Sequence, residues 1–255
     1  MVKRILIVTA LCLFAGSLFG GYFYHVRSFI SSERNSRMCS AVSLNVLDSL
    51  ESSIIDRDRL LEEAADMVLD RQCDSIDIFA LEKSLKAMGG IRTAEVYTVR
   101  RGEKVMVEIT QRKPVIRFQN GSERHYADSD GYLFPVSNAS DVQIVTGNLP
   151  IGLPDGYKGF SKEQASWISS MINLAGFIDS SPYWKKTIEQ IEIDSNGDVV
   201  LYTAVDSRRI VFGQPTDIST KFRKLEAFYR NILPDAGEKS YTTVNLKYRN
   251  QIICK

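Results

Sequence analysis

The first feature of the chain is a run of twenty residues, 5–24, that contains no charged side chain and follows Lys3 and Arg4. Ten of the twenty are Leu, Ile, Val or Phe, and a helix of this length spans about 30 Å, the thickness of the hydrocarbon core of a bilayer. The pattern predicts a membrane-spanning helix over residues 5–26. Because Lys3 and Arg4 favour the inner side of the membrane, residues 1–4 are predicted to be a cytoplasmic stub.

A cleaved signal peptide is the alternative interpretation of this run. The nearest small-x-small site is at residues 15–17, but the apolar run continues past it through Leu18, Phe19 and Phe23. A signal peptide usually ends its apolar region at the cleavage site. The pattern therefore favours a retained anchor over a removed one.

Polar residues without periodicity, 27–40, predict a linker after the anchor. From residue 41 the apolar positions predict a strand, two amphipathic helices and two further strands. Asp56 and Asp77 stand where the N-cap side chains of the two helices would lie. This β-α-α-β-β order defines a first exported domain over residues 41–113.

A second domain of short strands and two helices is predicted over residues 114–255. Its local signals are hairpin turns at Asp130-Gly131 and at residues 195–198, and a capping box at Ser161-x-x-Gln164. A second helix is expected over residues 217–232 and should end before Pro234. Extended structure is expected at residues 182–184, 241–246 and 247–254. The predicted fold class is α+β, with an antiparallel sheet and two packed helices in this domain.

Composition and charge restrict the chemistry of the chain. Lys plus Arg is 32 and Asp plus Glu is 31, so the formal net charge is +1, and the basic face of a nucleic-acid-binding protein is not expected. P-loop, G-x-S-x-G, H-E-x-x-H and C-x-x-C motifs are all missing, and the histidines are His25 and His125 alone. No catalytic, cofactor or metal site is predicted. A disulfide between Cys39 and Cys73 stays open, because nothing in the sequence shows that their side chains meet.

Several short segments of the two exported domains resemble, in their order and spacing, those of a known protein family. Residues 107–115 (VEITQRKPV) resemble the junction pattern I-x-V-x-E/Q-R-x-P, and residues 126–135 contain D-x-x-G. The other segments are residues 78–82, 91–96, 210–213, 221–225 and 244–251. Together they resemble the FtsQ/DivIB family of bacterial cell-division proteins, which has a POTRA domain followed by a β domain. The Gln-Arg junction and the Cys-Lys ending are similar to the variant found in Bacteroidetes.

The resemblance implies a non-enzymatic, bitopic scaffold of the divisome that links early and late cell-division proteins. Such a chain would be a single-pass protein of the inner (cytoplasmic) membrane at the division septum. Its N-terminus would be cytoplasmic and its bulk periplasmic. The implied partners are FtsB-like and FtsL-like single-span coiled-coil proteins, and no cofactor, nucleic acid or small-molecule substrate is implied.

The resemblance also implies where the partner binds. Strand addition at the C-terminal edge of the β domain would use backbone N–H and C=O groups that lack a neighbouring strand. The residues that match the family's partner-binding segment are Leu246, Lys247, Tyr248 and Arg249. Tyr248 would be an aromatic anchor; without the family, the same strand would be internal and Tyr248 would fill the core. In the POTRA domain an exposed edge is expected at residues 41–48 or 105–111.

Two other classes of function share some of these features. An envelope transport or outer-membrane assembly module would use a POTRA domain in the same way, but such proteins usually carry several copies, and no internal repeat is visible here. A membrane-anchored enzyme would require a convergent polar pocket, which the motifs do not supply. The divisome scaffold therefore remains the favoured hypothesis.

Overall fold

The structure is a computed structural model that describes residues 2–35, 38–48, 54–72, 75–99, 103–135, 141–152, 154, 156–236 and 241–255. The chain forms two compact units. The first consists of residues 1–48, 56–86 and 93–110, and the second of residues 49–55, 87–92 and 111–255.

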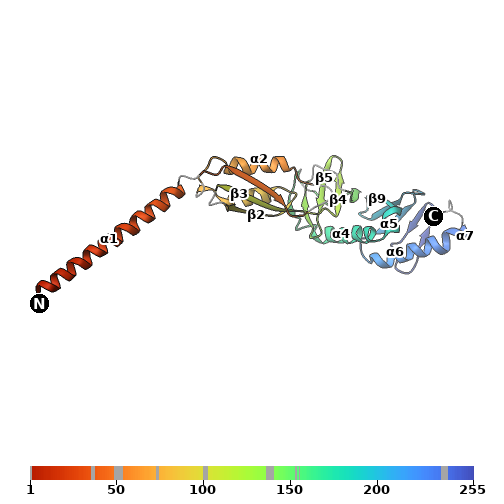
Figure 1. Cartoon of the computed structure of the whole chain (residues 1–255). Helices are drawn as coiled ribbons and strands as arrows, with labels where there is room; N and C mark the ends of the chain where they lie inside the picture. Colours follow the sequence, from red (N-terminus) through yellow and green to blue (C-terminus); the bar gives the residue numbers. More distant parts are fainter. Residues whose placement is uncertain are drawn as a thin grey trace. The chain divides into compact units, whose positions relative to one another are not determined.

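Helix α1, Val2–Asn35, opens the chain (Figure 1). It continues past residue 26 through much of the predicted linker, because residues 27–35 contain neither Pro nor Gly to interrupt a helix. Large apolar side chains such as Phe19 and Phe23 are about two-thirds exposed along it. Among the residues that the structure describes, no helix combines the length and apolar character needed to cross a membrane.

The predicted β-α-α-β-β order is confirmed. It consists of β1 (Ala41–Val46), α2 (Arg57–Val68), α3 (Ile78–Ala87), β2 (Ile91–Val99) and β3 (Lys104–Gln111). Both predicted N-caps are present: Asp56 Oδ1 accepts from the Asp58 and Arg59 amides at 3.1 Å, and Asp77 Oδ1 accepts from the Ala80 amide at 2.9 Å. Each cap satisfies amides that have no partner within their own helix.

The three-stranded sheet has the order β1-β3-β2, with β1 parallel to β3. Because β3 is central, the expected edge at residues 105–111 is wrong, whereas the alternative at residues 41–48 coincides with an outer strand. The other outer strand, β2, was not expected as an edge. Alternate residues of β3 are buried, so one face of this sheet is covered. Cys73 lies outside the described residues, and the Cys39–Cys73 disulfide remains a prediction that the structure does not test; Cys39 itself is buried.

In the described ranges of the second unit, ten strands form one sheet, in the order β13-β12-β11-β10-β9-β7-β4-β5-β6-β8. They are β4 (Ile116–Asn120), β5 (Glu123–Ala127), β6 (Tyr132–Phe134), β7 (Gln143–Gly147), β8 (Gly159–Phe160), β9 (Ile188–Ile193), β10 (Val199–Thr203), β11 (Arg209–Gly213), β12 (Thr243–Asn245) and β13 (Ile253–Cys254).

This sheet is mixed, so the predicted antiparallel sheet is wrong in part. The pairs β4/β7, β7/β9 and β11/β12 are parallel. Two of these pairs are joined through helices, which lie between β7 and β9 and between β11 and β12 in the chain. A crossover through a helix returns the chain in the same direction and therefore produces parallel neighbours.

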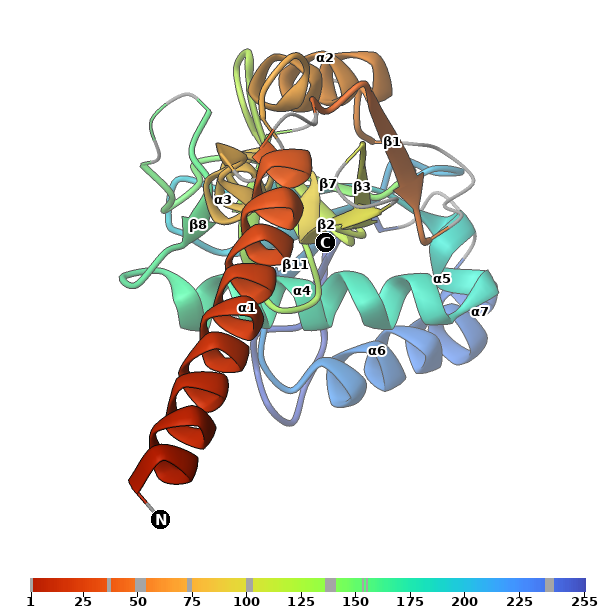
Figure 2. The same cartoon turned by 60° about the vertical axis from the view of Figure 1, so that its left-hand side comes forward.

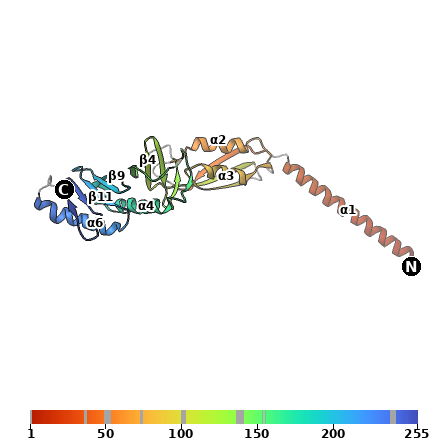
Figure 3. The ribbon, with the colours of Figure 1, turned by 180° about the vertical axis from the view of Figure 1, so that it is seen from behind.

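The helices of this unit are α4 (Ala165–Ser180), α5 (Pro182–Thr187), α6 (Ile218–Ala227), the π-helical turn η3 (Phe228–Ile232) and α7 (Leu233–Ala236). Figure 2 shows α4 beside α6, where Phe177 stacks on Phe222 at 4.7 Å between ring centroids. Figure 3 shows the reverse view, with β9 and β11 beside α6. These helices bury the apolar side chains of the sheet in one core.

Two local predictions in this region are wrong. Residues 182–184 start helix α5 instead of a strand, because Pro182 is at its first position and Ser181 Oγ accepts from the Trp184 amide at 3.4 Å. Pro234 does not end the preceding helix. It lies in the first turn of α7, directly after η3, at a position where a proline can be accommodated without an N–H donor.

The two motifs quoted above, the junction and the D-x-x-G hairpin, meet in the second unit. Arg112 Nη1 donates to Asp128 Oδ2 at 2.6 Å, and the guanidinium lies 3.4 Å from the centroid of the Tyr132 ring. Asp128 Oδ1 accepts from the amides of Asp130 and Tyr132 at 3.0 and 2.9 Å. Gly131 has a φ of +84°, which only glycine adopts without strain. The D-x-x-G spacing therefore forms a turn in which Asp128 accepts hydrogen bonds both from the amides of the turn and from Arg112.

Candidate partner-binding groove

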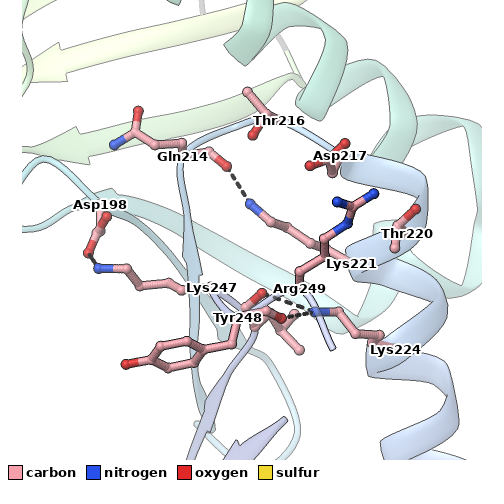
Figure 4. Close-up of a pocket in the computed structure, with 11 residues that line it drawn as sticks. Asp198, Gln214, Thr216, Asp217, Thr220, Lys221, Lys224, Lys247, Tyr248 and Arg249 are labelled. Atoms are coloured by element: carbon pink, nitrogen blue, oxygen red, sulfur yellow. Dashed lines mark hydrogen bonds and ion pairs between the residues drawn. The ribbon is translucent and has the colours of Figure 1, made fainter. Parts of the chain in front are cut away.

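An open groove of about 650 Å³ lies between α6 and the segment that follows β12 (Figure 4). The residues predicted for partner binding all line it. Among the residues that the structure describes, the lining consists of Asp198, Gln214, Thr216, Asp217, Thr220, Lys221, Lys224, Leu246, Lys247, Tyr248 and Arg249. Asp198, Lys221 and Lys224 were not among the predicted site residues, although the two lysines belong to a segment, 221–225, that carries the resemblance.

The segment after β12 is a turn and not the extended strand predicted for residues 247–254. Asn245 Oδ1 accepts from the Lys247 amide at 3.0 Å, the local contact by which Asn initiates turns. Lys224 Nζ donates to the carbonyls of Leu246 and Tyr248 at 3.3 and 2.6 Å. The chain then returns as β13, antiparallel to β12. Lys224, which lies on α6, thus binds two carbonyls of this turn.

The predicted residues differ in exposure. The Leu246 side chain is fully buried and belongs to the core, so it offers no exposed side-chain surface, and its role in partner binding stays a prediction. Tyr248 is 48% exposed, which also excludes the alternative in which it fills the core. Lys247 and Arg249 are exposed. The surface of the segment therefore consists of Lys247, Tyr248 and Arg249.

Lys247 crosses the groove to the hairpin between β9 and β10. Its Nζ lies 2.5 Å from Asp198 Oδ2, and this hydrogen bond raises the pKa of Lys247 above its ordinary value. The Lys247 stem passes over Gly213, where an added Cβ would lie 2.8 Å from Lys247 Cγ. Gly213 also has a φ of +76°. A glycine is thus required at this position for two reasons, its backbone conformation and the close approach of Lys247.

Lys221 forms the inner wall of the groove. Its Nζ donates to the Gln214 carbonyl at 2.7 Å and lies 4.7 Å from the centroid of the Phe212 ring. Burial lowers the pKa of this amine below its ordinary value. All three lysines of the groove are therefore engaged by the chain itself. The Arg249 guanidinium makes no hydrogen bond or ion pair with the residues that the structure describes, so it faces the groove as a donor fork without a partner there.

Strand β13, at the edge of the sheet, follows the groove residues 246–249 in the sequence. Lys255 and Thr243 exchange two backbone hydrogen bonds, at 2.9 and 3.0 Å. Cys254, opposite Val244, is the next pair of the ladder. In an antiparallel ladder the N–H and C=O of such an alternate residue point away from the neighbouring strand. Cys254 therefore directs its backbone groups outward from the sheet.

The groove has the chemistry of a binding surface. Four cations and two carboxylates line it, and each lysine contacts a carbonyl or Asp198. Within the described ranges, no group of three His, Cys, Asp or Glu side chains is placed to hold a metal ion. His125 is buried elsewhere, with Nε2 at 3.3 Å from the Pro154 carbonyl.

Comparisons with protein families agree with this architecture. The family model described as "FtsQ/DivIB, C-terminal related" matches residues 113–255, more than half of the chain. The chain belongs to the FtsQ/DivIB family. A model for a POTRA-like domain matches residues 37–110. No curated protein matches the sequence. FtsQ/DivIB and POTRA domains are typically non-catalytic scaffold domains, and membership of this family indicates a scaffold role in cell division at a membrane, with divisome proteins as partners.

Proposed function

We propose that this FtsQ/DivIB-family protein links early and late divisome components by recruiting FtsB-like and FtsL-like single-span coiled-coil proteins. The observation that carries the proposal is the rim of the groove, where Tyr248 is half exposed and Arg249 has no partner among the described residues. An exposed aromatic ring beside an uncommitted guanidinium is the composition of an interface hot spot. The proposed contact surface is Lys247, Tyr248 and Arg249.

Strand addition along β13 supplies the backbone part of the interaction. The outward N–H and C=O of Cys254 are the groups that an added strand would bind. Each such hydrogen bond contributes only about 0.5–1.5 kcal/mol, and β13 is short. Side chains must therefore supply most of the affinity and the choice of partner, with Tyr248 as the anchor and Arg249 opposite an acid of the partner.

The proposal includes a single-pass anchor in the inner membrane, over residues 5–26, with the N-terminus in the cytoplasm and the two folded units in the periplasm. The uncharged run of residues 5–24 supports it. So do the exposed apolar side chains of α1, such as Leu18, Phe19 and Phe23, because an uncovered row of this kind requires an apolar environment. Retention in the membrane fraction after alkaline carbonate extraction is the expected result, and release would contradict the anchor.

In-cell photocrosslinking tests the binding surface. A photoreactive phenylalanine analogue at position 248 should capture a small single-span coiled-coil protein, identified by mass spectrometry. The same analogue at position 160 is the control, because Phe160 is 58% exposed on β8, at the opposite end of the same sheet. Capture from 160 but not from 248 would contradict the proposed surface. Capture of a transport or outer-membrane assembly protein from 248 would contradict the division role.

A further inference from the structure

A second cavity, of about 540 Å³, lies in the same unit and shares no lining residue with the groove. Its walls come from the start of α5 and from the junction of α6 with η3. The lining residues are Ser181, Tyr183, Trp184, Glu226, Tyr229 and Arg230. We call it the aromatic cavity, because half of these side chains carry aromatic rings.

In the aromatic cavity the ring of Trp184 stands at a steep angle to each of the two tyrosine rings. Tyr183 and Trp184 are 4.8 Å apart with their planes at 75°, and Trp184 and Tyr229 are 6.3 Å apart at 60°. Trp184 is only 7% exposed and packs against Phe222 of the core at 5.1 Å. Tyr183 is 54% exposed. The cavity thus has rigid aromatic walls and one exposed ring, which can bind a ligand with little loss of side-chain entropy.

Trp184 also brings a hydrogen-bond donor to this cavity. Its ring N–H forms no hydrogen bond with any residue that the structure describes. Among the described residues, the fully buried side-chain nitrogen and oxygen atoms without a hydrogen-bond partner are Arg112 Nε and Arg117 Nε. The Trp184 ring nitrogen also has no partner but is not one of these atoms, so it keeps some accessible surface. Trp184 lines the cavity, so an acceptor bound there would lie beside the residue that carries this donor. An acceptor in the cavity would satisfy a donor that now has none.

The charges of the aromatic cavity cancel. Glu226 and Arg230, one turn apart, form an ion pair at 2.7 Å. A charged ligand would have to compete with this pair, whereas a neutral ligand that accepts hydrogen bonds would not. The cavity therefore combines aromatic faces, a free N–H donor and no net charge.

We propose that the aromatic cavity binds an extended, proline-containing segment of a partner protein. Such a segment adopts a polyproline II helix, which has no internal hydrogen bonds and therefore presents its carbonyls to outside donors such as the Trp184 N–H. Its pyrrolidine rings are neutral and apolar and pack between steeply angled aromatic rings. This second docking surface is separate from the groove and does not depend on the proposed function of the groove.

Tryptophan fluorescence of the full-length protein tests this proposal. The chain has two tryptophans, Trp167 and Trp184, so the substitution Trp167→Phe leaves Trp184 as the only reporter. Titration with a decaproline peptide should give a saturable change in fluorescence, and a decamer of alternating Gly and Ser should not. Tyr183→Ala should weaken decaproline binding about tenfold, the loss expected when an exposed aromatic contact is removed. Tyr183 is half exposed, so its removal should leave the fold intact, which circular dichroism checks.

Two further measurements make the proposal falsifiable. Tyr183→Phe should retain decaproline binding because the ring remains, and Tyr248→Ala, in the groove, should bind decaproline as the parent does. Equal responses to decaproline and the Gly-Ser peptide, or unchanged binding in Tyr183→Ala, would overturn the proposal. Tighter binding of decalysine or decaglutamate than of decaproline would show a charge-driven site and would also overturn it. Because Tyr183→Ala should still capture the coiled-coil partner, failure here is distinguishable from failure at the groove.

Discussion

The groove and the aromatic cavity border the same helix, α6, but they are built in different ways. Around the groove, Lys224 holds a turn through two carbonyls, and Lys247 contacts a hairpin through one carboxylate. Around the cavity, Trp184 and Tyr229 are held by packing against other rings. The first surface depends on a few hydrogen bonds, and the second depends on the core itself.

This difference predicts how each surface responds to substitution. At the rim of the groove, binding and stability should be separable, because Tyr248 and Arg249 contribute little to the core. At the aromatic cavity, binding and stability are linked, because Trp184 belongs to the hydrophobic core. Of the three aromatic residues, only the exposed Tyr183 can be truncated with little loss of stability. The substitutions below test that separation.

The largest effect is expected where the groove meets the core. Leu246→Ala should lower the free energy of unfolding by about 2–5 kcal/mol, because it leaves a cavity in a fully buried position. Tyr248→Ala should lower it by less than about 0.5 kcal/mol but should weaken partner capture by about 2 kcal/mol or more. Denaturant unfolding and a pull-down of the coiled-coil partner measure the two quantities. Equal losses of stability in both variants would show that Tyr248 is a core residue and that the surface is misassigned.

The next effect is expected at Gly213, beneath the Lys247 stem. Gly213→Ala should cost about 1–2 kcal/mol from its positive φ alone, and more because the new Cβ meets Lys247 Cγ. Gly156→Ala is the matched control, with a φ of +71° and no atom within 4 Å of the added Cβ. Adding Lys247→Ala to the Gly213 variant should recover the part of the loss due to the contact. No recovery would mean that Lys247 does not rest on Gly213.

Helix caps and turns could be predicted from the sequence, because nearby side chains or glycines determine them. The caps at Asp56 and Asp77 and the turns at Gly131 and Gly197 depend on residues within a few positions of one another. The parallel pairing of β7 with β9 was not predictable, because it depends on how helices α4 and α5 return the chain to the sheet. Strand pairing of this kind is decided by tertiary packing and leaves no short-range pattern.

The candidate site shows the same limit. The resemblance assigned residues 246–249 to a partner-binding segment at the C-terminal edge of the β domain, but it did not show which of their side chains face inward. Leu246 continues the buried alternation of β12, whereas Asn245 starts a turn that exposes the residues after it. Asp198 and Lys224 were missed because they contact this segment across 49 and 24 residues of chain. Only the family resemblance of residues 221–225 offered a signal for Lys224.

A smaller effect is expected at the clamp on the turn. Lys224→Met keeps the aliphatic stem but removes the donor to the Leu246 and Tyr248 carbonyls, so it should cost about 1 kcal/mol. Hydrogen exchange of residues 247–250 should become faster and partner capture weaker. Arg223→Met is the matched control, because Arg223 is the adjacent, exposed cation and contacts Thr220 Oγ1 at 3.3 Å. Similar exchange rates in both variants would contradict the role of Lys224.

The smallest effect distinguishes the two surfaces by their alkaline titration. Burial raises the pKa of Tyr229 above its ordinary 10.0, so the stability that its neutral phenol contributes is complete below pH 10.0 and is lost as the pH rises through the pKa of the folded state. Burial lowers the pKa of Lys221 below its ordinary 10.5. Its contribution has the opposite sign: it is present above pH 10.5 and is lost as the pH falls through the pKa of the folded state.

The variants Tyr229→Phe and Lys221→Met should therefore diverge from the parent in opposite directions. As the pH rises past 10.0, Tyr229→Phe should lose less stability than the parent, because it has no phenol to ionise in a buried place. Between the lowered pKa of Lys221 and its ordinary 10.5, Lys221→Met should lack the gain in stability that the parent obtains when its buried amine loses a proton. Denaturant midpoints measured across this pH range compare the three proteins. Parallel pH profiles would show that neither group is buried as the structure has it, and the contrast between a polar groove and a packed aromatic cavity would then fail at both residues.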